Sequence, residues 1–411
     1  LRQLDVKNAF LNGTLTDQVY MEQPPGYIDP RFPNHVCQLK KALYGLKQAP
    51  RAWFQSFSTF LIHLGFSCSR ADTSLFIYHQ KSNIIYLLLY VDDIIITGNN
   101  SSLLDSFTCK LNSEFATKDL GSLSYFLGLE ATPTSDGFFI SQLKYARDIL
   151  SRAQLLDSKP VHIPMVVSQH LSADGSLFSD PTLYRSLVGA LQYLTITQPD
   201  IAHAVNSVSQ FLHAPTEDHF LAVKRILRYV KGTIHFGLTF RPSSSPGALV
   251  AYSDTDWADC PDTRRSTSGY SIYLGDNLVS WSAKKQPTVF RSSCESEYCA
   301  LAFTVAELIW LTHLLRDLQV PMSQQPLLLC DNKSAFFLAP IRFHTNGLSM
   351  LNWTITFSVN LLWLANFAPN MSHLIYRLLI FLLRVFLVLY LSSFDPTSTS
   401  DPIRRFACGG C

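Results

Sequence analysis

The sequence has little net charge, no regular arrangement of cysteines and no signal peptide at its start. A formal net charge of +2 over 411 residues does not by itself indicate a nucleic-acid binder, so any such surface must be local. The nine cysteines lack the spacing of a disulfide framework, which favours a reducing compartment. The first residue is Leu1 rather than Met, and we expect the chain to be a fragment. Its length allows two or three domains.

The most informative stretch is an apolar, β-rich run interrupted by two adjacent carboxylates. Residues 84–91 are almost all apolar, Asp92 and Asp93 follow, and residues 94–97 are β-branched. This pattern predicts a hairpin of two buried strands with Val91, Asp92 and Asp93 at its tip. Adjacent aspartates are costly in a core unless they hold a metal or pair with a cation. A plain Asp-rich turn is the alternative, which the pair alone does not exclude.

Four segments in this order resemble the copia-type retrotransposon Pol polyproteins. They are LDVKNAFLNG at 4–13, LYGLKQAPRAWF at 43–54, YVDD at 90–93 and YSDTDWA at 252–258. The resemblance extends from Leu1 to about Ala339 and implies an α+β fold. We expect a reverse-transcriptase palm without its fingers strands at residues 1–165 and a helical thumb or connection at 166–245. An incomplete ribonuclease H-like α/β domain is expected at 246–339.

The resemblance implies a polymerase centre of three carboxylates, Asp5, Asp92 and Asp93. Asp5 ends a short apolar start that precedes the turn signal Asn12-Gly13. In this chemistry two Mg²⁺ ions, about 3.5–4 Å apart, are bridged by carboxylates and stabilise both the attacking 3′-oxygen and the leaving pyrophosphate. Mg²⁺ prefers oxygen ligands. The expected cofactor is therefore Mg²⁺, two ions per active site, with Mn²⁺ as a substitute.

The resemblance places the incoming nucleotide and the template against the segment around Gly45. A glycine permits close approach of the backbone to a ligand, and cations offset phosphate charge. The nucleotide- and template-binding residues that it implies are Tyr44, Gly45, Lys47, Pro50, Arg51 and Tyr90. From the residues alone, a solvated basic face is an equal alternative. The apolar residues from Trp53 to Leu64 have helical spacing, which indicates core rather than a platform for stacking bases.

The middle of the sequence predicts mainly helices. We expect an amphipathic helix at 101–115, strands at 123–130 and 137–140, and helical structure at 142–150 and throughout 181–240. In the last of these helices Thr216 is the expected N-cap and Gly232 the stop. Four cations form a stripe on this helix, namely Lys224, Arg225, Arg228 and Lys231. The stripe fits a solvated face and a contact with the primer–template backbone equally well.

A second catalytic centre is implied beyond residue 246. Strands are expected at 249–253, 270–274, 278–282 and 327–330, the last of them buried, and Ser292 should cap a long helix. Asp254, Glu297 and Asp331 each lie at the edge of an element and resemble the ribonuclease H site, where two metals assist attack of water on an RNA phosphodiester. Taken alone, Glu297 could equally be an ordinary glutamate of an early helical turn.

The composition changes at about Pro340, where charge becomes sparse and Leu, Phe and Trp accumulate. Residues 374–391 could span a membrane, but Arg377 and Arg384 would each cost about 2.5–3.5 kcal/mol near its centre. A one-base frameshift accounts better for the composition. If the gene is translated one base out of register, the codons across 349–360 can encode KHVELDYHFLRE and those across 361–384 can encode LALAGKLRTKYVPSHLSLADIFTK. Both strings resemble the C-terminal ribonuclease H sequence of the family. We therefore interpret 340–411 as an out-of-frame tail and expect no membrane.

The resulting hypothesis is an RNA-directed DNA polymerase with an attached ribonuclease H. Its expected partners are an RNA template, a DNA primer, RNA–DNA hybrid, dNTPs and other parts of a Pol polyprotein. The family implies virus-like particles in the cytoplasm and the nucleus as locations. We expect this copy to be decayed and inactive, because fingers strands and the last acidic residue of the nuclease are missing. The alternatives are an inactive nucleic-acid-binding remnant and a protein anchored in a membrane through 374–391.

Overall fold

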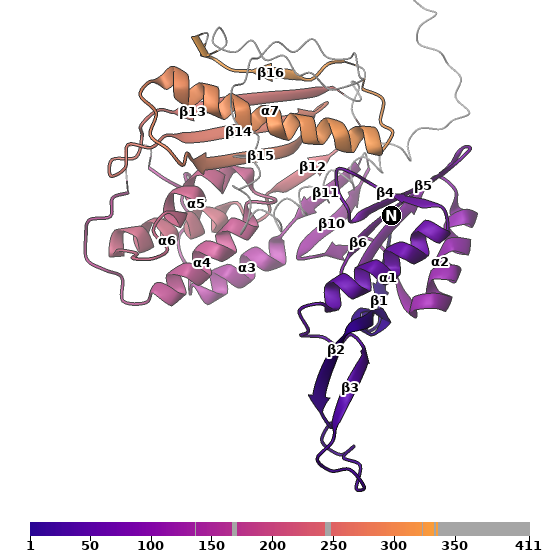
Figure 1. Cartoon of the computed structure of the whole chain (residues 1–411). Coiled ribbons are helices and arrows are strands. Elements are labelled where there is room, and N and C mark those ends of the chain that lie inside the picture. The colour runs from indigo at the N-terminus through magenta and orange to yellow at the C-terminus, as the bar shows by residue number, and fades with distance from the viewer. Residues whose placement is uncertain (136, 167–170, 243–247, 323, 333, 336–411) are drawn as a thin grey trace, which may run out of the picture. The chain divides into compact units, whose positions relative to one another are not determined.

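The computed structural model describes residues 1–335 except 136, 167–170, 243–247, 323 and 333 (Figure 1). The described residues form two compact units, Leu1–Leu123 and a second unit that begins at Ser124. Both units mix helices and strands, so the chain is an α+β protein, as predicted. The palm, thumb and nuclease bounds remain predictions. The tail at 340–411, with its apolar run at 374–391, lies outside the described residues.

The first unit is built on a six-stranded antiparallel sheet in the order β4-β5-β6-β7-β1-β8. Its strands are β1 (Arg2–Val6), β4 (Phe66–Cys68), β5 (Leu75–Gln80), β6 (Asn83–Tyr90), β7 (Asp93–Gly98) and β8 (Thr117–Ser122). The predicted hairpin is therefore β6 with β7. The first strand of the chain lies between β7 and β8, which brings residue 5 beside residue 93.

Two helices cover one face of this sheet; the second has the predicted span, and the first includes most of the region where helical spacing was predicted. They are α1 (Ala49–His63) and α2 (Ser101–Phe115). Alternate residues of the strands point toward them, because successive side chains of a strand face opposite sides. The shared core contains Trp53, Phe57 and Leu61 of α1, Phe107, Leu111 and Phe115 of α2, and Leu4, Val6, Leu87, Ile94 and Ile96 of the sheet. The aromatic residues after Pro50 are thus core, as predicted.

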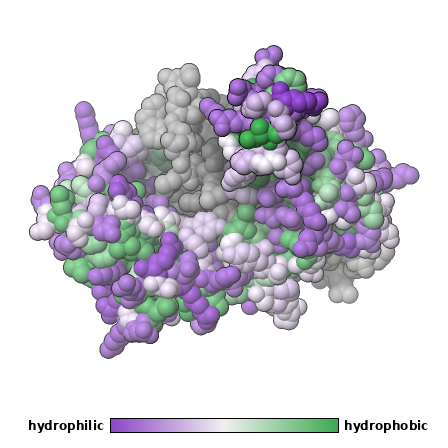
Figure 2. Space-filling model, turned by 90° about the horizontal axis from the view of Figure 1, so that it is seen from below, coloured by the Kyte–Doolittle hydropathy of each residue, from purple (hydrophilic) through white to green (hydrophobic). Residues whose placement is uncertain are grey.

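A hairpin projects from the first unit (Figure 1). It consists of β2 (Thr14–Glu22) and β3 (Val36–Lys41), and a short 3₁₀ helix, Ala9–Asn12, joins it to β1. Figure 2 shows the hairpin end-on, with hydrophilic and hydrophobic residues side by side on its surface. At its base, the Ala42 N–H donates to the Gly13 carbonyl at 2.9 Å. This contact closes the base of the hairpin, beside the end of the Ala9–Asn12 helix.

The second unit begins with a four-stranded antiparallel sheet and a group of helices. The sheet has the order β12-β11-β10-β9, with β9 (Tyr125–Phe126), β10 (Leu129–Thr134), β11 (Gly137–Ser141) and β12 (Gly237–Phe240). The helices are α3 (Leu143–Arg152), α4 (Pro181–Leu194), α5 (Ala202–Ser209) and α6 (Glu217–Gly232). The helical prediction for 237–240 was wrong. After α6 ends, Leu238 and Phe240 alternate inward as strand residues and pair with β11.

The N-terminus of α6 is capped by the predicted residue. The Thr216 hydroxyl accepts from the His219 N–H at 3.4 Å, and Nδ1 of His219 accepts from the Thr216 N–H at 2.9 Å. His219 thus takes the part that Glu or Gln usually takes in a capping box. The α3–α6 helices share one apolar core, in which the buried Tyr184 hydroxyl donates to the Val208 carbonyl at 2.7 Å.

The last part of the described chain is a second four-stranded sheet with one long helix. The sheet has the order β15-β14-β13-β16, with β13 (Leu249–Asp256), β14 (Thr267–Leu274), β15 (Asn277–Lys285) and β16 (Leu327–Leu329). The prediction that β16 is buried was wrong, because Leu327 is 51% and Leu329 is 39% exposed. β16 is an edge strand that pairs only with β13, in parallel, among the described strands.

The long helix α7 (Ser293–Asp317) packs against β13 and β14 (Figure 1). The Ser292 hydroxyl caps it as predicted, accepting from the Glu295 N–H at 3.2 Å. By length and composition alone, α7 is the one helix in the described part of the chain that could cross a membrane. Its leucines at 301, 308, 311, 314 and 315 are buried inside the unit, as in the core helix of a globular domain.

Gly13 offers a test of how tightly the start of the chain packs on α1. A Cβ at Gly13 would lie 2.9 Å from the Ala52 Cβ and 2.9 Å from the Trp53 backbone nitrogen. We expect Gly13→Ala to lower the free energy of unfolding by about 1–3 kcal/mol, because backbone atoms must shift to admit the methyl group. Urea unfolding of the full chain measures the change.

The matched control is Gly189→Ala. Gly189 lies in α4 with open space where a Cβ would be, so alanine should stabilise the helix by about 0.5–1 kcal/mol. Equal effects of the two substitutions would contradict the close approach at Gly13.

Candidate active sites

The first unit brings three of the predicted carboxylates together. The register of β1 and β7 places Asp5 directly opposite Asp93, and Asp92 immediately precedes Asp93 in the β6–β7 turn. Directly opposite residues on antiparallel strands have Cβ atoms roughly 4.5–5.5 Å apart. Gln3, a buried residue on the same face of β1 as Asp5, forms a side-chain hydrogen bond with Asp93. Tertiary pairing therefore gathers residues that are far apart in the sequence.

The turn that carries Asp92 is tight and strained. Tyr90 pairs with Asp93, so Val91 and Asp92 alone form the turn. Val91 has a φ of 55°, in the left-handed region that β-branched residues rarely occupy. Such a conformation costs on the order of 1–3 kcal/mol and persists only where the surrounding structure holds it.

Two hydrogen bonds hold this turn in place. The indole Nε1–H of Trp53 donates to the Val91 carbonyl at 2.5 Å, and the Val6 N–H donates to the Asp92 carbonyl at 2.8 Å. Trp53 is 1% exposed, so its polar group needs a buried partner. Sequence reasoning identified Trp53 only as core. The available signal was its indole N–H on an otherwise apolar helix face.

The carboxylates of the first site repel one another. Burial raises the pKa of the Asp93 carboxyl and the charge of Asp92 raises it further; the Gln3 hydrogen bond opposes the rise, and the charge of Asp5 adds to it. None of the ion pairs among the described residues includes these aspartates. Three oxygen donors that lack a neutralising side chain fit a hard divalent cation such as Mg²⁺.

The segment predicted to bind nucleotide and template lies on the surface of the same unit. Tyr44, Gly45, Lys47, Pro50 and Arg51 are exposed, whereas Tyr90 is half-buried in β6. The Tyr44 side chain is 90% exposed, and its ring centroid lies 5.8 Å from that of Phe10, just beyond β1. The loop is therefore open to a ligand near the end of the Asp5 strand. Contact with a nucleotide remains a prediction.

The second unit brings together the other three predicted carboxylates. Asp254 lies in β13 and Asp331 just beyond β16; the parallel pairing of Tyr252 with Leu329 places them at the same end of the sheet. Glu297, from α7, is 5% exposed. The pKa of Glu297 is raised to about 7, mainly by burial and then by the charges of Asp254 and Asp331, while hydrogen bonds from Cys330 and the Thr255 backbone oppose the rise.

Cys330 belongs to this second cluster, and sequence reasoning missed it. Ligand atoms of Glu297, Cys330 and Asp331 all lie within 4.8 Å of one another. Among the described residues, no other trio of His, Cys, Asp or Glu has this spacing, and neither Asp254 nor the aspartates of the first unit meet it. The position of Cys330 directly before Asp331 was the only signal in the sequence.

The basic stripe of α6 is half-buried and partly engaged within the chain. Arg228 Nε donates to the Lys159 carbonyl at 2.7 Å, and Lys231 Nζ donates to the Ser158 carbonyl. Lys224 Nζ lies 4.5 Å from the centroid of the Phe220 ring. Arg225 Nε is buried, with no hydrogen-bond partner among the described residues. Arg228 and Lys231 therefore anchor the 158–159 segment, and contact of the stripe with nucleic acid remains a prediction.

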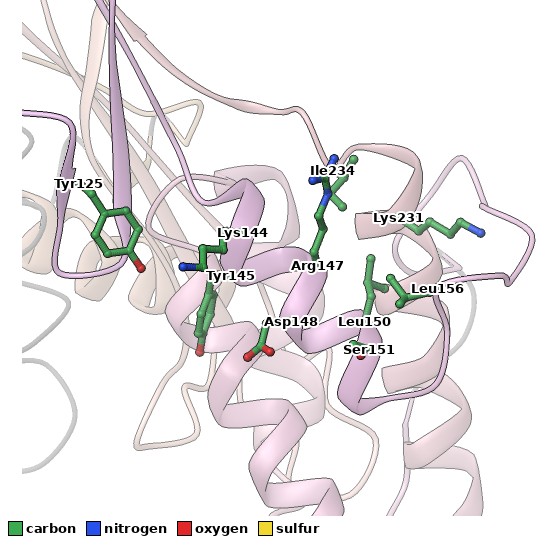
Figure 3. A pocket seen from close by; sticks show the side chains of 10 residues that line it. All are labelled: Tyr125, Lys144, Tyr145, Arg147, Asp148, Leu150, Ser151, Leu156, Lys231 and Ile234. Carbon is green, nitrogen blue, oxygen red and sulfur yellow. The ribbon is translucent and has the colours of Figure 1, made fainter.

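A pocket of about 630 Å³ adjoins the end of this stripe (Figure 3). Lys231 lines it together with Lys144 and Arg147 of α3 and with Tyr125 of β9. Lys144 Nζ lies 5.9 Å from the centroid of the Tyr125 ring. The sequence pattern around α6 did not reveal these α3 cations, because they come from a different helix.

Comparisons with known proteins place the chain in a class and then in a family. A family model described as reverse transcriptase (RNA-dependent DNA polymerase) matches residues 1–167. The Retrovirus-related Pol polyprotein from transposon RE1 of Arabidopsis thaliana is 50% identical over 339 residues, which are 82% of this chain and 23% of that protein. The corresponding polyprotein from transposon TNT 1-94 of Nicotiana tabacum is 38% identical over 352 residues, 82% of this chain and 26% of that protein.

A shorter relative is matched over its whole length. The putative transposon Ty5-1 protein of Saccharomyces cerevisiae is 33% identical over 309 residues, which are 74% of this chain and 100% of that protein. The chain thus belongs to the reverse transcriptase class. More particularly, it belongs to the copia-type retrotransposon Pol polyprotein family, as the sequence resemblance predicted. It spans about a quarter of the length of the RE1 and TNT 1-94 polyproteins.

The strained turn predicts that a substitution at Val91 stabilises the chain, whereas most substitutions destabilise a protein. Asparagine adopts the left-handed conformation more readily than valine, so Val91→Asn should raise the free energy of unfolding by about 1 kcal/mol. The control is Val36→Asn at an exposed position of β3, where the loss of β propensity should lower stability slightly. Urea unfolding measures both variants. A destabilised Val91→Asn chain would show that Val91 is not strained.

The raised pKa of Glu297 yields a pH dependence. The folded state holds a proton that the unfolded state has already released between its ordinary pKa of 4.5 and about 7. The contribution of Glu297 to stability should therefore be greatest below pH 4.5 and should fall as the pH rises through this window. In metal-free buffer, Glu297→Gln should flatten that slope, whereas Glu295→Gln, at an exposed position of the same helix, should retain it. An unchanged slope in Glu297→Gln would contradict the assignment.

Proposed function

We propose that the chain carries the polymerase and ribonuclease H centres of a copia-type element, with an RNA template, a DNA primer and dNTPs as partners. One observation carries the polymerase proposal: Asp5 lies opposite Asp93, beside Asp92 on a turn held by Trp53 and Val6. A strained turn held from two sides is typical of a functional site. The matched reverse transcriptase family supports the same activity.

The three aspartates would hold divalent metal ions, two Mg²⁺ or Mn²⁺ in the proposed chemistry. Bound at this site, the ions would supply positive charge to the attacking and leaving oxygens of an in-line displacement. The protein's own contribution is position: the Val91 turn fixes Asp92, β1 fixes Asp5, and Gln3 orients Asp93. Lys47 and Arg51, both exposed, would offset the charge of a nucleotide triphosphate.

For the second unit we propose hydrolysis of the RNA strand of an RNA–DNA hybrid. Asp254, Glu297 and Asp331 would hold the metal ions there. The support is the buried Glu297 carboxyl, which faces the charges of the other two and takes part in no ion pair among the described residues. A buried carboxylate of this kind is costly unless a metal or a proton neutralises it. Other parts of a Pol polyprotein are further proposed partners.

We also propose that this copy is decayed and inactive, as the out-of-frame interpretation of 340–411 implies. The polymerase site therefore needs a test that does not depend on turnover. Mn²⁺ binding, followed by electron paramagnetic resonance, provides one, and primer extension on a primed RNA template provides the second readout.

We expect the chain to bind Mn²⁺ and Asp92→Asn to weaken that binding at least about tenfold, because a ligand is lost. The matched control is Glu114→Gln on an exposed face of α2, which should bind like the parent. Mn²⁺ binding by Asp92→Asn as tight as that of the parent chain would contradict the assignment of the site. Robust primer extension that depends on Asp92 would establish polymerase activity and contradict the proposed inactivity of this copy.

A further inference from the structure

The second cluster contains a soft ligand that the proposed nuclease chemistry does not use. The Cys330 thiol lies 3.8 Å from Oε2 of Glu297, and the Asp331 carboxylate completes a trio within 4.8 Å. Mg²⁺ prefers oxygen ligands, whereas a thiol is a ligand for Zn²⁺ and similar thiophilic cations. The same few atoms therefore offer two kinds of metal chemistry.

The separation of the Cys330 sulfur and the Glu297 carboxylate suits tetrahedral coordination of one ion. With a Zn–S distance of about 2.3 Å and a Zn–O distance of about 2.0–2.2 Å, tetrahedral angles separate the sulfur and oxygen ligands by roughly 3.5 Å. The observed separation of 3.8 Å needs a shift of only a few tenths of an ångström. Asp331 is exposed, so a cation can reach the trio from solvent. Three protein ligands would leave the fourth position open to water.

Two further observations point to a cation at this place. Glu297 is almost completely buried, and none of the ion pairs among the described residues includes it, so its charge lacks a neutralising side chain. In addition, the Asn332 N–H donates to the Cys330 sulfur at 3.4 Å. A hydrogen bond of this kind orients a metal ligand from outside the coordination sphere.

We propose that Glu297, Cys330 and Asp331 form a binding site for one thiophilic divalent cation of the Zn²⁺ class. Because Glu297 and Asp331 also belong to the proposed nuclease centre, Zn²⁺ and Mg²⁺ compete for them, and Zn²⁺ inhibits hydrolysis of the hybrid. The competition rests on the proposed nuclease function, whereas the binding site rests on the geometry of the trio alone.

Binding is tested on the full, reduced, metal-free chain with Co²⁺ as the probe, because a cobalt–thiolate bond gives a charge-transfer band in the near ultraviolet. The expected result is a band that saturates at one equivalent and disappears on addition of Zn²⁺. Cys330→Ser removes the band and lowers Zn²⁺ affinity by more than about tenfold. Cys299→Ser, which removes a half-buried thiol from α7, retains the band.

Absence of the band from the parent chain, or its persistence in Cys330→Ser, overturns the proposal. Thermal unfolding without metal shows whether both cysteine variants are folded. If Cys330→Ser is unfolded, Cys330→Ala replaces it, and the same loss of the band is expected.

Hydrolysis of an RNA–DNA hybrid with Mg²⁺ tests the competition separately. For each chain we compare the Zn²⁺ concentration that halves its own rate of hybrid hydrolysis. Relative to the parent, this concentration should be at least about tenfold higher in Cys330→Ser and unchanged in Cys299→Ser. Equal inhibition of the parent and Cys330→Ser overturns the competition. A parent chain that shows the Cys330-dependent band without hydrolysing the hybrid supports the metal site and the proposed inactivity of this copy, and overturns the inhibition of hydrolysis by Zn²⁺.

Discussion

The antiparallel pairing of β1 with β7 is the contact on which the first unit depends. It inserts the first strand of the chain between β7 and β8, where Leu4 and Val6 enter the core beneath the two helices. The alternation of side chains then places Gln3 and Asp5 on the opposite face, beside Asp93. One register thus fixes both the packing of the unit and the position of its acidic site. A shift of one residue would exchange the two faces.

Both acidic sites accumulate carboxylates without a cationic side chain to neutralise them. In the first unit the charges of Asp92 and Asp5 add to burial in raising the pKa of Asp93; in the second unit burial and neighbouring charge raise the pKa of Glu297. The first site adds backbone strain at Val91, which the Trp53 indole restrains. The second adds a thiol beside its carboxylates. Carboxylate charge without a neutralising side chain is thus the physical feature that the two sites share.

Local patterns predicted the helices well, but they predicted the short strands at Gly237–Phe240 and Leu327–Leu329 poorly. Helix α2 has the predicted span and α1 lies where helical spacing was predicted, because apolar residues at helical spacing require only one buried face. The exposed β16 and the strand at Gly237–Phe240 were mispredicted, since the burial and pairing of a short strand depend on its neighbours in the sheet. The cations of α6 show the same limit. Their stripe was visible in the sequence, whereas the carbonyls that Arg228 and Lys231 bind belong to another segment.

The sequence by itself determined the family, the α+β class, and the six aspartate and glutamate residues that the two units bring together in two groups. These features are local: motifs, apolar periodicity and acidic residues at the ends of strands. Only the tertiary structure decided that the Trp53 indole binds the Val91 carbonyl, that Gln3 contacts Asp93, and that Cys330 lies beside Glu297. The physical reason is that hydrogen bonds and ligand distances act over a few ångströms. They depend on which distant segments the packed sheet and helices bring together.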